Sequence, residues 1–190
     1  PEGYEARYTL PKERPTVVFI DDRASRVPTR QARELIGQTA ERALLSKGVV
    51  KDMIEARLAL ATLRGERFNE PMTIAQVGKA VHADVVIYAT IDGWSLTPDG
   101  QTFAPQADLR VKVVDATTNS ELWPGENASA GTLSVRVPEQ ARTAPTSTAM
   151  VSDAHLDLAR WVGLRLAQTF YNHGPDEVPT KFSAQDRRRE

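Results

Sequence analysis

Two unbroken runs of apolar residues constrain the fold of this chain more than any other feature. The first, Thr16–Ile20, is rich in β-branched residues and is closed by Asp21 and Asp22. The second follows Asp84 and continues to Ile91. Strands that are apolar on both faces are typical of the centre of a sheet that is covered on both sides. We therefore expect two central strands with helices packed against them.

Helical periodicity fills the region between these two strands. Thr29 is expected to cap a helix that runs to about Lys47, and Gly48 stands in the position of a helix C-cap. Further along, Thr73 begins a capping-box pattern that opens a short helix over Ile74–His82. The order of strand, helix and strand predicts α/β packing.

Two other segments also carry a helical pattern. The segment Val49–Arg64 is ambiguous, because two valines could open a strand while its alanine and leucine content favours a helix. Both assignments stay open at this point. A long final helix is predicted from a cap at Ser152 to Tyr171, with one apolar stripe along its length.

Three shorter strands are predicted in the second half of the chain. Ala107–Val113 alternates apolar and charged residues, Ser120–Trp123 returns after a tight turn, and Gly131–Val137 alternates again. Consecutive strands joined by turns predict an antiparallel meander. The fold class is therefore α/β with α+β character, a single domain in which helices flank a mixed β-sheet that includes this meander.

The domain boundaries follow from composition. Residues 1–15 are polar and without periodicity, so we expect an extended lead-in. Residues 16–174 form the single α/β domain. Residues 175–190 are charged and poor in apolar residues, and a disordered tail is predicted there.

Composition also narrows the functional classes. The chain has 24 basic and 25 acidic residues and a net charge of -1, whereas nucleic-acid binding normally requires a basic surplus. The sequence contains no cysteine, which excludes disulfides, thiolate zinc sites and cysteine nucleophiles. It also lacks an apolar run of about 18 residues that could span a membrane.

No recognised catalytic or cofactor-binding pattern is present in the sequence. The three histidines, His82, His155 and His173, have no metal-ligand spacing with one another. Nucleophile-elbow, Rossmann and P-loop glycine patterns do not occur. We therefore expect a protein that is not an enzyme and binds neither a metal ion nor a cofactor.

The acidic residues at the strand ends support an alternative hypothesis. Asp21 and Asp22 follow a buried strand, as do the magnesium-binding carboxylates of phospho-accepting receiver domains. Asp92 follows the second central strand. A small-molecule-binding or receiver-like module would use these three carboxylates. However, Tyr88 and Ala89 stand where the phosphoacceptor aspartate of such a domain would be expected.

Tryptophans are the candidate partner-binding residues. Trp94 and Trp123 lie near strand ends, beside glycine or proline, where a large amphipathic side chain can anchor a partner. Both are also compatible with core packing. Trp161 has helical spacing within the final helix and is assigned to the core.

Two stretches, Ile74–Ile91 and Ala107–Trp123, resemble a superfamily of bacterial envelope lipoproteins. The group includes the curli secretion component CsgG, LpoB-type activators of penicillin-binding proteins, and the amino-terminal domain of TolB. In these proteins a helix ends in an alanine–aspartate pair that leads into a central strand, like Ala83 and Asp84 here. A later strand carries a valine–aspartate–alanine–threonine turn, which corresponds to residues 114–117.

The resemblance implies a function for the chain. It implies a periplasmic scaffold or regulator in cell-envelope assembly, anchored to the outer membrane only by a lipid on a cysteine upstream of Pro1. The implied partners are envelope proteins, either a cell-wall synthase or a secretion or assembly component, and an oligomer is compatible with it. No catalytic residues are implied.

Overall fold

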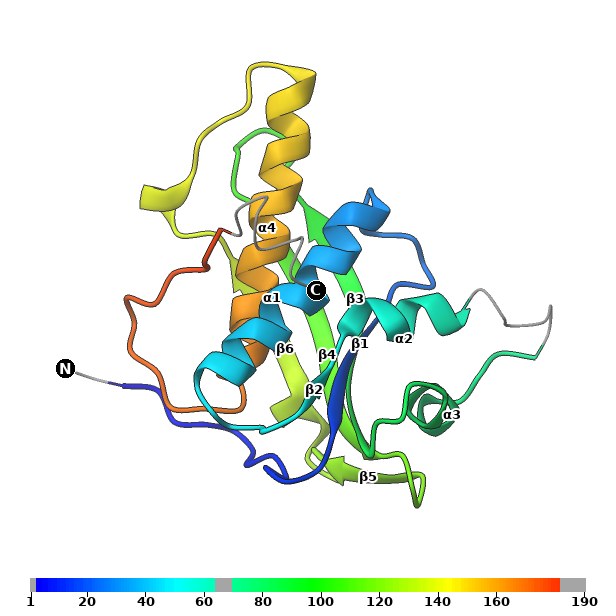
Figure 1. The fold of residues 1–190 in the computed structure, drawn as a ribbon. Helices are drawn as coiled ribbons and strands as arrows, with labels where there is room; N and C mark the ends of the chain where they lie inside the picture. The colour runs from blue at the N-terminus through cyan, green and yellow to red at the C-terminus, as the bar shows by residue number, and fades with distance from the viewer. Residues whose placement is uncertain (1–2, 64–69, 182–190) are drawn as a thin grey trace.

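The computed structural model describes residues 3–63 and 70–181 of the chain. In these residues, a six-stranded mixed sheet carries helices on both faces (Figure 1), which confirms the predicted fold class. Strands β2 (Met53–Ile54), β1 (Thr16–Asp21) and β3 (Val85–Ser95) are parallel to one another and adjacent in that order. Strand β4 (Gln106–Asp115) then pairs antiparallel with β3.

Strands β3, β4 and β5 (Ser120–Trp123) form an antiparallel meander. We expected the next strand, β6 (Thr132–Arg136), to continue beyond β5, but it pairs with β4 instead. The reason is the difference in strand length. The short strand β5 pairs only with Val113–Asp115, so the preceding part of the same β4 edge is open to β6.

Two helices cover one face of the sheet. These are α1 (Arg30–Ser46) and α4 (Thr148–Gln168), which lie side by side over the larger core (Figure 1). The predicted cap of α1 is confirmed, because the Thr29 hydroxyl accepts a hydrogen bond from the Ala32 N–H at 3.1 Å. Gly48 has the positive φ of 66° expected of a residue just past a helix end.

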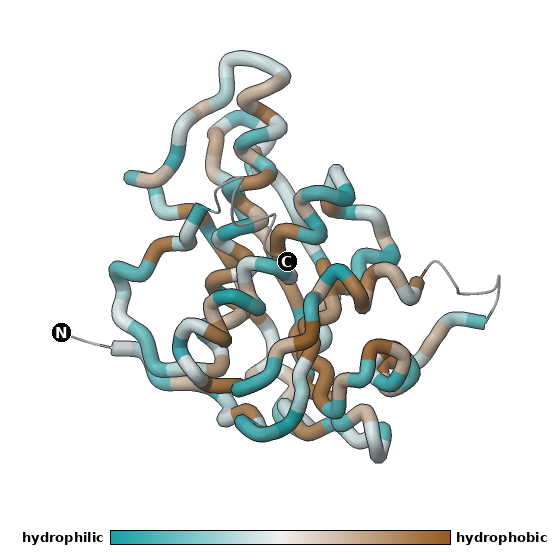
Figure 2. Tube along the Cα trace, in the orientation of Figure 1, coloured by the Kyte–Doolittle hydropathy of each residue, from teal (hydrophilic) through white to brown (hydrophobic). Residues whose placement is uncertain are grey.

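The opposite face is covered by two short helices, α2 (Ala56–Thr62), which packs against β1, and α3 (Ile74–Ala80), which packs against β3 and β4. The capping box predicted at Thr73 is present. The helix ends two residues before His82, which has a φ of 62°. Figure 2 shows apolar residues along the central strands and along the helices that face them, so the sheet lies between two cores of unequal size.

Two sequence assignments change in the structure. The ambiguous segment holds both elements, first β2 and then α2. The final helix begins at Thr148, because the Ser147 hydroxyl accepts a hydrogen bond from the Met150 N–H at 3.2 Å. The predicted cap Ser152 therefore lies inside the helix, and α4 ends at Gln168.

Both ends of the described chain pack against the domain. In the lead-in, the Arg7 N–H donates to the Thr169 carbonyl at 2.7 Å, and Tyr4 forms a β-bridge with His173. After the final helix, Glu177 accepts a hydrogen bond from the Tyr171 hydroxyl at 2.7 Å. Residues 182–190 of the predicted tail lie outside the described residues.

Candidate functional site

Helix α3 leaves part of the sheet face uncovered. Val17, Phe19 and Val86 form the smaller core beneath α2 and α3. Further along the same face, the side chains become polar and range from partly buried to exposed. We call this surface the open face and define it by Tyr88, Thr90, Arg110, Lys112 and Glu121.

Two adjoining depressions hollow the open face. One has a volume of about 370 Å³ and reaches from Asp21 toward the start of α3. The other has a volume of about 450 Å³ and reaches toward Pro124 and Gly131. Tyr88, Lys112 and Glu121 line both of them, so the two form one broad and shallow surface.

Tyr88 lies at the centre of the open face and bonds to a buried carboxylate. Its hydroxyl donates to Asp21 Oδ2 at 2.5 Å, and the Arg23 guanidinium donates to the same oxygen at 3.0 Å. Burial, followed by the hydrogen bond to Asp21, raises the pKa of the Tyr88 hydroxyl well above its usual range. Tyr88 therefore remains a neutral hydrogen-bond donor and is a poor proton acceptor for catalysis.

The cations of the open face have partners within the sheet. Arg110 makes a two-pronged contact with Asp92, with distances of 2.8 and 3.0 Å. The Lys112 ammonium lies 5.5 Å from the centre of the Tyr88 ring and 3.9 Å from Glu121. The result is an aromatic ring surrounded by charges of both signs, an arrangement that suits the surface of another protein.

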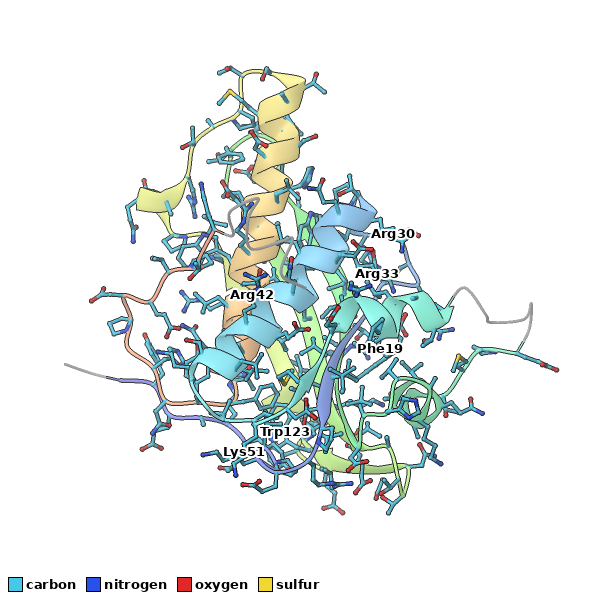
Figure 3. The ribbon with its side chains drawn as sticks, in the orientation of Figure 1. Phe19, Arg30, Arg33, Arg42, Lys51 and Trp123 are labelled. Carbon is cyan, nitrogen blue, oxygen red and sulfur yellow. The ribbon has the colours of Figure 1, made fainter. Side chains whose placement is uncertain are left out.

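The acidic strand ends of the alternative hypothesis lie near a position where α/β folds often bind ligands. Strand order reverses between β1 and β3, and the carboxyl ends of parallel strands form a crevice at such a switch point. Asp22, however, accepts hydrogen bonds from the N–H groups of Arg26 and Val27 at 2.9 and 2.8 Å. The Arg33 guanidinium, labelled in Figure 3, donates to the carbonyl of Ile20.

The three carboxylates therefore have separate partners. Asp21 contacts Tyr88, Asp22 orders the loop after β1, and Asp92 pairs with Arg110 on the surface. Within residues 3–63 and 70–181, no group of three or more histidine, aspartate or glutamate side chains could hold a metal ion. Among the helices in those ranges, none has the length and apolar character needed to cross a membrane.

The two candidate tryptophans lie away from the open face. Trp123, labelled in Figure 3, is only 9% exposed and stacks on Tyr8, with ring centres 6.0 Å apart. Trp94 is half-buried, and its indole N–H donates to His155 Nδ1 at 3.0 Å. Trp94 pairs with Ala107 and Trp123 with Val113, so they lie near opposite ends of β4, about 20 Å apart along the strand.

Trp123 packs in the larger core, which is the alternative to partner binding that the sequence left open. Partner binding by Trp123 stays a hypothesis. Trp94 retains partial exposure, and partner binding by Trp94 stays a hypothesis. The sequence did not single out Tyr88 or Lys112 as site residues. The one available signal was the charged row on β4, whose alternation predicted that Lys112 faces outward.

Comparison with known proteins gives no family assignment. No family model matches the chain, and no curated protein matches its sequence. Among solved structures, the chain is similar to a PelC dodecamer from Paraburkholderia phytofirmans, with 13% identity and a TM-score of 0.45 over 89% of this chain and 90% of that one.

Two further structures are similar to this chain. Lipoprotein GNA1162 from Neisseria meningitidis is 16% identical, with a TM-score of 0.43 over 76% of this chain and 95% of that one. The LpoB C-terminal domain from Salmonella enterica is 16% identical, with a TM-score of 0.36 over 70% and 86%. These neighbours thus include a bacterial lipoprotein and an LpoB domain. With identities below 25% and TM-scores below 0.5, they assign neither a family nor an activity to this chain.

Proposed function

We propose that this chain is a non-catalytic protein-interaction domain of the bacterial cell envelope. In this proposal it is periplasmic, is anchored to the outer membrane by a lipid, and acts as a scaffold or regulator of envelope assembly. Its partner is an envelope protein such as a cell-wall synthase or a secretion or assembly component. The setting rests on the resemblance of Ile74–Ile91 and Ala107–Trp123 to envelope lipoproteins.

The observation that carries the interaction role is the open face. Small-molecule sites are usually enclosed and mostly apolar, with a few polar groups that converge on the ligand. The open face is broad and shallow, and Arg110, Lys112 and Glu121 spread across it in pairs of opposite charge. A central aromatic ring within a polar surround is the common composition of a protein–protein contact.

The receiver-like alternative receives less support from the geometry. A receiver domain needs carboxylates that are available to bind a metal ion together. Here both oxygens of Asp22 accept backbone hydrogen bonds, and Asp92 is paired with Arg110. The strand-end carboxylates are therefore better explained as parts that hold the β1 loop and the sheet surface in place.

Crosslinking in cells that express the full-length gene product tests this function. The captured proteins are identified by mass spectrometry for the wild type and for two charge reversals, Lys112→Glu and Lys51→Glu. Both lysines lie beside a glutamate, but only Lys112 lies on the open face. We expect envelope proteins with the wild type and Lys51→Glu, and at least a fivefold lower recovery with Lys112→Glu.

Two results would contradict the proposal in different ways. Recovery of cytoplasmic enzymes alone would overturn the envelope assignment. Equal recovery of envelope proteins by both variants would show that the partner binds elsewhere, and the open face would no longer be the interaction surface.

A further inference from the structure

Strand β6 forms an outer edge of the sheet beside the first half of β4. In an antiparallel ladder, the N–H and C=O of one residue point to the same side, and consecutive residues alternate between sides. The Thr132 carbonyl accepts a hydrogen bond from the Arg7 guanidinium at 2.8 Å, so Thr132 points away from β4. The Val137 N–H donates inward, to the Pro105 carbonyl at 3.1 Å.

This alternation identifies the backbone groups on the outer side of β6. Leu133 and Val135 bond to β4, where they lie opposite Leu109 and Ala107. Thr132, Ser134 and Arg136 therefore present their N–H and C=O groups outward. Apart from the Arg7 contact on Thr132, no hydrogen bond to these outward groups exists within residues 3–63 and 70–181.

Three of the usual protections against strand pairing are missing at this edge. Natural edge strands are commonly interrupted by proline or a bulge, or are very short. The five residues Thr132–Arg136 contain no proline, and their pairing with β4 has no register shift. At the other edge of the sheet, β2 has only two residues. Thus β6 offers the longer template for an added strand.

Charge indicates what kind of strand would fit. Arg7 lies at the Thr132 end of the edge and Arg136 at its other end, and both side chains are exposed. Neither forms an ion pair with a carboxylate among the described residues. One acidic residue of the neighbouring strand, Asp108, lies opposite Ser134 and accepts a hydrogen bond from Gln106 at 3.4 Å. The two arginines therefore favour a negatively charged segment.

The same charges disfavour a second copy of this chain. If two β6 strands paired antiparallel about Ser134, Arg136 of one copy would lie opposite Thr132 of the other. The Thr132 carbonyl already holds the Arg7 guanidinium. Two like charges would then be adjacent at each end of the shared edge, which is destabilising.

We propose that β6 accepts an extended acidic segment of a partner protein as an added antiparallel strand. The backbone of the segment pairs with Ser134 and Arg136, and its carboxylates lie beside Arg7 and Arg136. This mode of recognition obtains affinity from main-chain hydrogen bonds and specificity from alternate side chains. The proposal rests on the proposed protein-interaction function, but it does not depend on the open face.

A peptide titration followed by NMR tests the proposal directly. The probe is a blocked heptapeptide that alternates glutamate and valine, and its matched control alternates lysine and valine. We expect the glutamate peptide to shift the amide signals of Ser134 and Arg136 and to bind at least tenfold more tightly than the lysine peptide. Ser134→Pro should weaken this binding at least tenfold, whereas Ser134→Ala should leave it unchanged.

The proline variant leaves the sheet intact because the Ser134 N–H points away from β4, and proline is tolerated at such edge positions. An unchanged pattern of amide signals elsewhere in the domain checks this. Should Ser134→Pro not fold, Arg136→Glu provides a second variant and should also weaken glutamate-peptide binding at least threefold.

Three outcomes would overturn the edge proposal. These are equal binding of both peptides, unchanged binding to a folded Ser134→Pro, or shifts confined to the open face. None of them affects the crosslinking result, so the edge proposal can fail while the protein-interaction function stands. If crosslinking captures no envelope protein but the peptide binds as expected, the assignment to the envelope fails alone.

Discussion

At the scale of single residues, Asp115 joins the β4–β5 turn to the lead-in. Its carboxylate accepts hydrogen bonds from the Arg14 guanidinium at 2.9 and 3.1 Å, and from the N–H groups of Thr117 and Thr118. The hydrogen bond from Arg14, the largest cause, holds the pKa of the Asp115 carboxyl well below its usual range. This explains in physical terms the valine–aspartate–alanine–threonine turn recognised in the sequence.

The lowered pKa predicts how acid affects stability. The native state favours the ionised form of Asp115 more than the unfolded state does. The stabilisation of the fold by this ionised carboxylate is therefore fully present above the unfolded pKa of about 3.9. That contribution is lost as the pH falls from there toward the lower native pKa. We expect Asp115→Asn to lower the free energy of unfolding by about 1 to 3 kcal/mol at pH 7. The difference from the wild type should shrink below pH 4.

Urea unfolding at pH 7, 5 and 3 measures this dependence. Asp176→Asn is the control, because Asp176 is exposed and its replacement should change the free energy of unfolding by less than about 0.5 kcal/mol. A deficit of Asp115→Asn that is as large at pH 3 as at pH 7 would show that the ionised carboxylate is not its source.

The contact between Trp94 and His155 predicts a second pH effect, nearer neutrality. The Trp94 indole donates to Nδ1 of His155, which must therefore be neutral, with its proton on Nε2. Burial lowers the pKa of His155 from 6.5. The native state thus binds fewer protons than the unfolded state, so stability is complete above the unfolded pKa and is lost as the pH falls through it toward the native pKa.

We expect the free energy of unfolding of the wild type to fall between pH 7.5 and 5.5. The variant His155→Gln should lack most of this fall, while the control His82→Asn should retain it, because asparagine tolerates the positive φ at this position. Chemical unfolding across this pH range gives the comparison. Parallel curves for the wild type and His155→Gln would refute the role of His155.

At the scale of secondary-structure elements, α1 and α4 approach each other closely at Gly163. A Cβ atom at this position would lie 2.5 Å from the Ile36 carbonyl oxygen and 2.7 Å from Thr39 Cβ. The helices could accept an alanine only by moving apart, which costs about 1 to 3 kcal/mol in a packed core. The gain in helix propensity, about 1 kcal/mol, offsets this cost only in part.

We therefore expect Gly163→Ala to lower the free energy of unfolding by up to about 2 kcal/mol. Val151→Ala on the same helix is the control, since Val151 is 38% exposed and its loss should cost less than about 0.5 kcal/mol. Denaturant unfolding of both variants decides the matter. A stabilised Gly163→Ala would mean that propensity outweighs the close contact.

The elements that were predicted correctly carry local signals. Thr29 and Thr73 are helix caps whose partners lie within three residues, so the sequence shows them directly. The start of α4 was predicted too late, at Ser152. The first buried residue of this helix is Ala154, so its first turn extends beyond the core and carries no apolar stripe. Hydrophobic periodicity finds a helix only where the helix is buried.

The features missed in the candidate site depend on contacts between distant residues. Tyr88 and Asp21 are 67 residues apart in sequence, and their contact follows from the β1–β3 register, which places Asp21 opposite Thr90. The placement of β6 beside β4 likewise depends on the shortness of β5. Period-two alternation predicted that Arg110 and Lys112 face outward, but it gives no strand partner and no register.

At the scale of the whole molecule, the lead-in is part of the folded domain. Tyr8 stacks on Trp123 across the larger core, and Arg7 bonds both to the segment after α4 and to β6. Tyr4 pairs with His173, so the start of the described chain lies beside the end of the last helix. An extended segment with no periodicity of its own is thereby fixed by contacts to three distant elements, which composition alone cannot reveal.

Removal of residues 1–9 should therefore destabilise the whole domain. The largest loss is the packing of the Tyr8 ring against Trp123, and burial of a side chain of this size contributes about 2 kcal/mol. For a domain of this length, such a loss lowers the midpoint of thermal unfolding by about 4 to 8 °C. Removal of residues 1–3 keeps Tyr4 and Tyr8 and should leave the midpoint unchanged. Thermal unfolding by circular dichroism compares the three chains. An unchanged midpoint after removal of residues 1–9 would mean that the lead-in rests on the domain without stabilising it.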